Sequence, residues 1–500
     1  MNKMLVFSFL VALSLTACAG RPEGVPDPKL IPTRVASHPF DVAWDDRTVF
    51  REGLIEAEQP VLDQLPGATV YHIDLQVPRN FRRLHGREQV LYTNREDEPL
   101  DAIYFRLFPN TAGGEETVSD LVVDGQDVDP VYEFLDSAMR VPLPVALQPG
   151  EQVEIQMDFE VKVAREMGGN YGLFGYFDDI LVLDEFYPVI PVYDDEGWNV
   201  EVPPPNGDLP YYDASLYLVR VAVPSNVTVV ASGVEIGREH EGRNQVLTFA
   251  AGPARSFYVA ASDRYVVVSK TVGETTINCY VVAGLEDDRA EMTLQQVRDA
   301  LKSFGERLGT YPYTEFDVVS TPMLAMGVEY PGLIALALNL YESNSPMAAL
   351  ESTVAHEVGH QWFYNVVGND QVDEPWLDEA IVQYVTGLYY RDTYSARAEL
   401  DWHDWMFARW SRAGQADIPI GLPSGSYDSR EYGAIVYGRG PLFVAALEEE
   451  MGRETFDKFL RDYYESHKWG VATGDEFKQL AEHHCQCNLT ALFEEWVYEK

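Results

Sequence analysis

Positive charge is scarce in this chain of 500 residues. Only 37 residues are Lys or Arg, and nine of these are Lys, against 80 Asp and Glu. The formal net charge of -43 would repel nucleic-acid phosphates and anionic lipid surfaces. The composition therefore disfavours a nucleic-acid-binding function, and it suits a protein that works in a saline medium.

Cysteine and long apolar runs are also lacking. The four cysteines, at positions 18, 279, 485 and 487, are too few for a disulfide scaffold and too irregularly spaced for a zinc finger. We interpret Cys279 as a buried strand residue, and Cys485 and Cys487 as structural rather than as a metal or redox dyad. The longest internal apolar stretch, 318–340, is broken by two prolines and a glutamate, so no transmembrane helix is predicted there.

The N-terminus has the pattern of an export signal. Lys3 precedes the apolar stretch 4–15, which is too short for a transmembrane helix but typical of a secretory signal. The segment ends Leu-Thr-Ala-Cys at Cys18, which resembles the lipobox of bacterial lipoproteins, where this Cys carries the lipid. We expect a signal peptide at 1–17, a lipidated Cys18 with a Pro-rich tether over 18–40, and a place in the bacterial cell envelope, at the outer membrane if the cell is Gram-negative. An ordinary cleaved signal with a chance Cys is the alternative.

The length predicts more than one folded unit. Residues 41–268 contain short alternating segments rich in Val, Tyr and Phe, which predict a β-sheet-rich domain. Residues 269–500 are predicted to form a mainly helical domain with a small strand element. Helices are expected at 287–309, 346–366, 376–392, 396–412, 433–450, 453–466, 474–484 and 489–498. Strands first and helices second indicate an α+β multidomain fold rather than a doubly wound one.

The expected helix 346–366 contains the pattern His356-Glu357-x-x-His360. Residues four apart share one face of a helix, so both imidazoles can bind a single ion. Glu357 lies on the neighbouring flank, where its carboxylate can reach a metal-bound water without ligating the metal. This is the HExxH arrangement of zinc sites. The alternative is two surface histidines beside an ordinary salt-bridging glutamate.

A third metal ligand follows in the next expected helix. Glu379 comes after 18 intervening residues, within Trp-Leu-Asp-Glu-Ala. Two His and one Glu, with a fourth position open for water, form a catalytic zinc set, so the sequence predicts one zinc ion per chain held by His356, His360 and Glu379. A solvated glutamate favoured by the helix dipole is the alternative for Glu379. The adjacent Asp378 either orients a group behind the metal or is a solvated residue at the helix start.

Together these motifs resemble the gluzincin zinc aminopeptidases, the group of membrane alanyl aminopeptidase and leukotriene hydrolase, here as a short bacterial lipoprotein member. Glu329, within Met-Gly-Val-Glu-Tyr, stands where the family has G-x-M-E-N, and Tyr437, within Tyr-Gly-Arg-Gly, stands where it has Y-x-K-G. Residues 253–262 resemble the last strand of the family's N-terminal domain. The resemblance implies a thermolysin-like catalytic domain over 269–500, without the large C-terminal helical domain of longer members.

The resemblance also implies a role for each site residue. Zinc would polarise the scissile carbonyl and activate a water molecule, and Glu357 would pass the proton of that water to the leaving amine. Tyr437 would donate a hydrogen bond to the developing oxyanion. Glu329 would bind the free α-ammonium of the substrate, which would make the enzyme an aminopeptidase. A second amine anchor is expected near 176–179, without a specific residue.

The chain departs from the family at several motif positions. Met326, Val328 and Tyr330 replace the Gly, Met and Asn of the first motif, and Arg439 replaces the Lys of the second. Alternatives to the aminopeptidase stay open: a zinc endopeptidase of the same fold, an epoxide hydrolase side activity, or a non-catalytic envelope lipoprotein that uses the fold for binding. Retention of the general base and the tyrosine disfavours the last. The expected partners are peptides with a free N-terminus and, through the lipid, the membrane.

Overall fold

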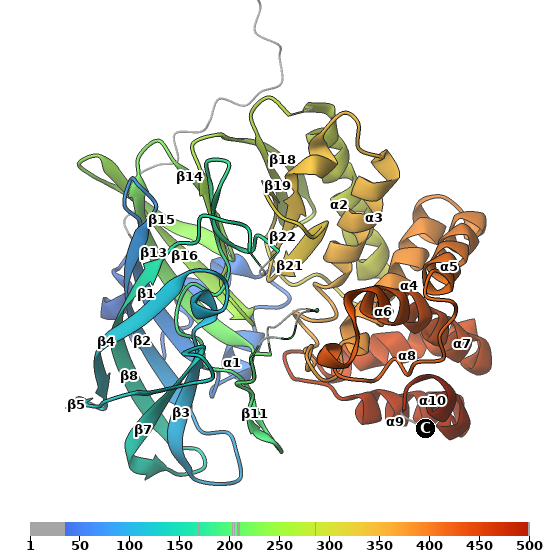
Figure 1. Ribbon diagram of the computed structural model, residues 1–500, viewed down its shortest axis with the longest axis horizontal. Helices are drawn as coiled ribbons and strands as arrows, with labels where there is room; N and C mark the ends of the chain where they lie inside the picture. Colours follow the sequence, from blue (N-terminus) through green and yellow to red (C-terminus); the bar gives the residue numbers. More distant parts are fainter. Residues whose placement is uncertain are drawn as a thin grey trace, which may run out of the picture.

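The computed structural model describes residues 36–168, 171–202, 204, 206–207, 211–285 and 287–498. The predicted signal peptide, Cys18 and most of the tether lie outside the described residues. A β-rich region comes first in the chain and a helical region second, and the two pack side by side (Figure 1). Within the part of the chain that is described, no helix is both long and apolar enough to cross a bilayer.

An eight-stranded sheet forms the frame of the β-rich region. Its strands are β1 (Val70–Gln76), β2 (Arg83–Thr93), β4 (Glu115–Val123), β5 (Gln126–Asp127), β8 (Gln152–Lys162), β13 (Ser215–Pro224), β15 (Val234–Glu241) and β16 (Asn244–Ala254). They lie in the order β15-β16-β13-β1-β2-β8-β4-β5, and only β1 and β13 run parallel. In β8 buried and less buried residues alternate along the whole strand, which is the pattern of a sheet with one face on a core.

Smaller sheets complete this region. A three-stranded sheet contains β3 (Leu100–Arg106), β7 (Ala138–Leu147) and β6 (Val131–Glu133). A four-stranded sheet contains β14 (Thr228–Ala231), β17 (Val259–Ser262), β10 (Ile180–Leu183) and β9 (Phe174–Phe177). Strand β11 (Tyr193–Asp194) pairs with β12 (Gly197–Trp198). Strands β10 and β17 are buried throughout because they lie in the middle of their sheet. The segment 253–262 falls at the end of β16 and in β17, so its prediction as strand is largely confirmed.

A five-stranded sheet begins the second region and is larger than the small strand element that we expected. Its strands are β18 (Tyr265–Val272), β19 (Thr275–Val282), β20 (Glu315–Thr321), β22 (Leu333–Ala337) and β21 (Gly327–Tyr330), in that order. The boundary expected at residue 268 falls inside β18, which belongs to this second sheet. A two-residue turn containing Gly273, with φ of 61°, folds β18 directly onto β19, so β18 joins the second sheet.

Ten α-helices are present in the described part of the chain. They are α1 (Val61–Gln64), α2 (Asp287–Arg307), α3 (Met347–Gly359), α4 (Trp376–Thr393), α5 (Ala396–Ser411), α6 (Ser429–Ala434), α7 (Gly440–Met451), α8 (Arg453–Ser466), α9 (Gly474–Cys485) and α10 (Thr490–Trp496). Two predicted helices need correction. The helix expected over 346–366 ends at Gly359, and the helix expected over 433–450 is α7 preceded by a π-helical turn, Ile435–Arg439, and the end of α6.

The cysteines behave as structural residues. Cys485 and Cys487 form a disulfide at the end of α9, and Cys279 is fully buried in β19. Burial raises the pKa of the Cys279 thiol to about 12, which keeps this side chain protonated and unreactive.

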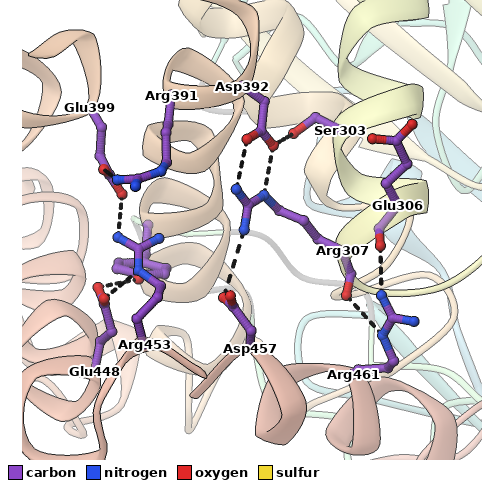
Figure 2. Close-up of polar contacts among 11 residues, drawn as sticks. Ser303, Glu306, Arg307, Arg391, Asp392, Glu399, Glu448, Arg453, Asp457 and Arg461 are labelled. Atoms are coloured by element: carbon purple, nitrogen blue, oxygen red, sulfur yellow. Dashed lines mark hydrogen bonds and ion pairs between the residues drawn. The ribbon is translucent and has the colours of Figure 1, made fainter. Parts of the chain in front are cut away.

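Ion pairs connect the helices on the side of α4 that faces away from the first region (Figure 2). Arg453 of α8 pairs with Glu399 of α5 at 2.7 Å and also with Glu448 of α7. Arg307 of α2 binds Asp392 near the end of α4 through two contacts of 2.6 Å. Individual pairs at the surface contribute little, but a network of this kind fixes the relative positions of five helices.

Arg255, in the link between β16 and β17, ties the β-rich region to the helical region. Its Nε donates to the carbonyl oxygens of Tyr364 at 2.6 Å and Asn365 at 2.9 Å. Nη1 donates to the carbonyl of Tyr212 at 2.8 Å, and Nη2 donates to that of Gly470 at 2.5 Å. The guanidinium is buried, so these carbonyls replace the water that it would otherwise bind.

A larger side chain at position 368 should destabilise the protein, because Gly368 lies directly against Arg255. A Cβ at position 368 would lie 2.2 Å from Cζ of Arg255, so Gly368→Ala must displace the guanidinium from its carbonyls. We expect a loss of about 1–3 kcal/mol in the free energy of unfolding, measured by urea denaturation. Gly305→Ala is the control, because a Cβ there would meet nothing within 4 Å and Ala favours helix α2. Equal stability of the two variants would contradict this packing argument.

Candidate metal centre and cavity

Helix α3 places the HExxH residues in the interior. Its sequence contains three Ala and two Glu, which favour helix, and nine of its 13 residues are buried. Gly359, the last residue of α3, lies against α4: a Cβ there would be 2.9 Å from Cγ1 of Val382. This close approach brings the histidines of α3 next to Glu379 in the first turn of α4.

The three predicted ligands converge on one point. The distance between Nε2 of His356 and Nε2 of His360 is 3.2 Å. Oε2 of Glu379 lies 3.1 Å from Nε2 of His356 and 3.6 Å from Nε2 of His360. The ligands of a tetrahedral zinc lie about 2.0–2.2 Å from the metal, which puts them roughly 3.3 Å from one another. The observed triangle therefore has the dimensions of one face of a zinc tetrahedron.

The hydrogen bonds around this triangle fit a metal site as well. Oε2 of Glu379 is buried and has no hydrogen-bond partner among the described residues, as expected of an oxygen reserved for a cation. Nδ1 of His360 lies 3.1 Å from the carbonyl oxygen of Phe363, which identifies Nδ1 as the protonated nitrogen and leaves the Nε2 lone pair for a metal. The residues present thus fit zinc.

The ionisable groups of the site perturb one another strongly. Burial would raise the pKa of Glu379, but the imidazoles of His356 and His360 hold it below its usual range. Burial lowers the pKa of His356. Burial would also lower the pKa of His360, but the carboxylates of Glu329 and Glu379 raise it instead. The ligand carboxylate is therefore ionised, as metal binding requires.

The two residues predicted to assist the reaction also lie at the centre. One ligand atom from each of His356, Glu357 and His360 lies within 4.8 Å of the others, and Glu357 lines the cavity described below. Tyr437 lies on the π-helical turn, and its hydroxyl donates a hydrogen bond to Oε1 of Glu379. Both side chains thus surround the space left open by the three ligands.

Glu329 reaches the site from β21, on the far side of His360. Its Oε1 lies 3.9 Å from Nδ1 of His360 and 3.3 Å from the amide nitrogen of Gln371. The same amide donates to Asp378 at 2.6 Å. Asp378 is almost fully buried, so it supports the ligands from behind and is not a solvated helix-start residue. Burial and the neighbouring Glu379 raise the pKa of Asp378 to about 7.

A cavity of about 720 Å³ opens in front of the ligands. It lies between the β-rich region and the helices, and all of the predicted site residues except His360 line it; His360 is fully buried behind it. The cavity is large enough for a short peptide, because binding sites for small molecules usually measure several hundred Å³.

Sequence reasoning missed several residues of this cavity. The second amine anchor was expected near 176–179, but the acidic residues of the β-rich region that line the cavity are Asp184 and Glu185, directly after β10. An adjacent pair of acids at the end of a fully apolar strand was the available signal. Arg409 and Arg412, from the C-terminal end of α5, also line the cavity, and no motif marks them.

The match to a known family covers this site. Residues 292–496, which include the ligands, Glu329 and Tyr437, match the family described as Peptidase family M1 domain. Residues 292–496 are thus similar to peptidase family M1 domains. The resemblance to gluzincin aminopeptidases is thereby confirmed, whereas the lipoprotein assignment stays a prediction.

Curated relatives of the M1 domain are aminopeptidases. The chain is 26% identical to Aminopeptidase 2 of Candida albicans over 265 residues, 48% of this chain and 28% of that protein. It is 25% identical to Probable aminopeptidase 2 of Sulfurisphaera tokodaii over 312 residues, 58% of this chain and 39% of that protein. The chain thus spans well under half the length of these relatives.

Solved structures extend the likeness to the whole fold. The M1 zinc metallopeptidase from Deinococcus radiodurans superposes with a TM-score of 0.66 at 20% identity, covering 90% of this chain and 96% of that one. A mutant of that enzyme bound to the substrate Tyr-Ser-Ala gives a TM-score of 0.65 at 20% identity, covering 87% and 95%. The predicted fold, a β-rich region followed by a helical one, is therefore confirmed, and it is shared with M1 zinc metallopeptidases of known structure.

Substitutions in the M1 domain should separate metal binding from proton transfer. We expect about one zinc ion per chain in the wild type, very little in His360→Ala, and normal zinc in Glu357→Gln, because Glu357 is not a ligand. Metal analysis of the purified proteins measures this directly. His240→Ala, at an exposed site outside the matched residues 292–496, is the control and should keep its zinc. Zinc retained by His360→Ala would contradict the assigned ligand set.

Proposed function

We propose that this protein is a zinc-dependent aminopeptidase that releases N-terminal residues from peptides. The observation that carries the proposal is the convergence of Nε2 of His356, Nε2 of His360 and Oε2 of Glu379 to distances of 3.1–3.6 Å, with Glu357 and Tyr437 beside them. The aminopeptidase names of the curated relatives support the same activity.

The chemistry divides between the metal and the side chains. Zinc held by this set would polarise the scissile carbonyl and make the attacking water more acidic. Glu357 takes the proton of that water and delivers it to the leaving amine, because its carboxylate lies beside the ligands without belonging to them. Asp378 and the carbonyl of Phe363 hold the ligand residues in position from behind.

Tyr437 stabilises the negative charge that develops on the carbonyl oxygen. Its hydroxyl donates to Oε1 of Glu379, so it already points toward the metal centre. Donating to the oxyanion requires only that this hydrogen bond be exchanged for one to the substrate. A donor that is held in place before the reaction contributes more than one that must be ordered during it.

The acidic residues of the cavity favour an aminopeptidase over an endopeptidase. Glu329, Asp184 and Glu185 line the same cavity as the ligands. A peptide presents a positive group there only at its free N-terminus, unless it carries a basic side chain. The α-ammonium would form a charge-assisted hydrogen bond with Glu329 and hold the first peptide bond over the metal centre.

Blocking the amine should therefore abolish most of the activity. N-acetylated peptides should be cleaved at least about a hundred-fold more slowly than the same peptides with a free N-terminus, since one buried carboxylate loses its partner. Glu329→Gln should lower kcat/KM for free peptides and leave the low rate on acetylated peptides nearly unchanged.

The exposed Glu449→Gln variant serves as the control and should match the wild type on both substrates. The products, identified by mass spectrometry, should be single residues released from the N-terminus. Equal rates on free and blocked peptides, or a majority of internal cuts, would overturn the aminopeptidase in favour of the endopeptidase while leaving the zinc hydrolase intact.

We further propose that the protein is a lipoprotein of the bacterial cell envelope, anchored through Cys18. The support is the N-terminal sequence alone: a positive residue, a short apolar stretch and Leu-Thr-Ala-Cys. Residues 19–40, rich in Pro and Gly, would separate the lipid from the folded part. Peptides would then be hydrolysed outside the cytoplasm, where the acidic surface is exposed to the medium.

Cys18→Ser should block lipidation and processing together. The full-length variant should migrate more slowly in gels and should leave the detergent phase, in which the wild type partitions, because the attached acyl chains provide the membrane affinity. Cys279→Ser is the matched control for loss of a thiol. Unchanged processing and partitioning of Cys18→Ser would refute the anchor.

A further inference from the structure

Two arginines of α5 face the cavity without a partner. Arg409 and Arg412 both line it, three residues apart near the end of the helix. Among the described residues, neither guanidinium forms an ion pair or a hydrogen bond. On the same helix, by contrast, Arg397 pairs with Asp401 at 2.5 Å. In a chain with 80 acidic and 37 basic residues, two neighbouring arginines that form no ion pair with a described carboxylate are unexpected.

The surroundings of Arg409 compensate its charge only in part. Its Cζ lies over the ring of Tyr437, 5.0 Å from the ring centre, and this cation–π contact is its main interaction. Burial lowers the pKa of Arg409 on balance, although Tyr437 and the carboxylate of Glu379 act to raise it; the positive charge of Arg412 adds to the effect of burial. A half-buried cation beside a second cation is unfavourable in the free protein, and an anion bound in the cavity would relieve this cost.

The position of Arg409 limits which part of a peptide can reach it. The centre of the Tyr437 ring lies 6.0 Å from the ring centre of His356, so the guanidinium is no more than about 11 Å from a metal ligand. An extended peptide advances about 3.3–3.6 Å per residue, so this distance covers about three residues. Arg409 lies beside Tyr437, which contacts Glu379, whereas Glu329 lies 3.9 Å from Nδ1 of His360, so the two charges lie next to different ligands.

From this arrangement we infer that Arg409, assisted by Arg412, binds a carboxylate of the peptide on the leaving-group side of the scissile bond. The inference rests on the proposed function. The cavity would be bipolar: its carboxylates receive the ammonium and its arginines receive the carboxylate. Short peptides carry both charges at the right separation, so di- and tripeptides are the preferred substrates. The planar guanidinium of Arg409 can bind both carboxylate oxygens at once.

The inference is tested directly by measuring peptide binding to a variant that cannot hydrolyse the peptide. The zinc-loaded Glu357→Gln protein is titrated by calorimetry with Ala-Ala-Ala and with the C-terminal amide of the same peptide. The free acid should bind about ten-fold or more tightly than the amide, since the amide lacks the charge that the arginines bind. Adding Arg409→Gln should remove the difference, and Arg409→Lys should restore part of it because it keeps the charge but not the paired geometry.

Two controls separate this subsite from a structural role of Arg409. Arg397→Gln, on the exposed face of the same helix, should leave the preference for the acid unchanged. Arg409→Gln in the active enzyme should raise KM for the acid much more than KM for the amide. Equal binding of acid and amide by the parent protein, or an equal fall in kcat for both peptides in Arg409→Gln, would overturn the inference.

The source of the carboxylate is resolved with longer peptides. Pentapeptide amides with Asp or Asn at the second position carry no C-terminal charge, so a preference for Asp in the parent that disappears in Arg409→Gln assigns the subsite to an acidic side chain as well. If the parent protein does not prefer Asp over Asn, the subsite binds only the C-terminal carboxylate. Selective binding of the acid without any hydrolysis by the wild type would refute the proposed function alone, and hydrolysis without selectivity would refute the subsite alone.

Discussion

The active-site geometry depends on one buried cation that takes no part in the chemistry. Arg255 donates to the carbonyl oxygens of Tyr364 and Asn365, in the turn that follows α3, and to that of Gly470. The same turn contains the Phe363 carbonyl, which lies 3.1 Å from Nδ1 of His360. The β-rich region thereby sets the conformation of the turn that orients a metal ligand.

The chain has few basic residues, and some of them form ion pairs that stabilise the helices around the metal site. Arg307 and Arg391 contact acidic partners at the C-terminal end of α4 and on α5, while Glu379 lies in the first turn of α4. The helix dipole favours a carboxylate at that N-terminal end, and the ion pairs hold the other end of the same helix (Figure 2). With 37 basic residues against 80 acidic ones, a free arginine in the cavity is therefore more significant than it would be on a balanced surface.

Features that depend on residues close together in the sequence could be predicted, whereas features that depend on contacts between distant residues could not. The i, i+4 spacing of His356 and His360, and the helix that carries Glu379, follow from local periodicity and are confirmed. The end of α3 at Gly359 was missed because the following turn is stabilised by distant Arg255, and apolar residues continue through it. Arg409 could not be assigned to the cavity either, because only the packing of α5 against the π-helical turn brings it there.

The departures from the family motifs have structural explanations. Tyr330, in place of the family's Asn, is buried and stacks on Tyr258 of the β-rich region with ring centres 4.0 Å apart. Arg439, in place of Lys, does not line the cavity; it donates to the carbonyl oxygen of Glu495 at 3.0 Å and pairs with Asp417 at 2.9 Å. Both replacements strengthen contacts that surround the site. The groups proposed to act on the substrate, by contrast, keep the chemical identity that the family motifs have, because a carboxylate or a phenol in contact with the reacting atoms could not be replaced by a packing residue.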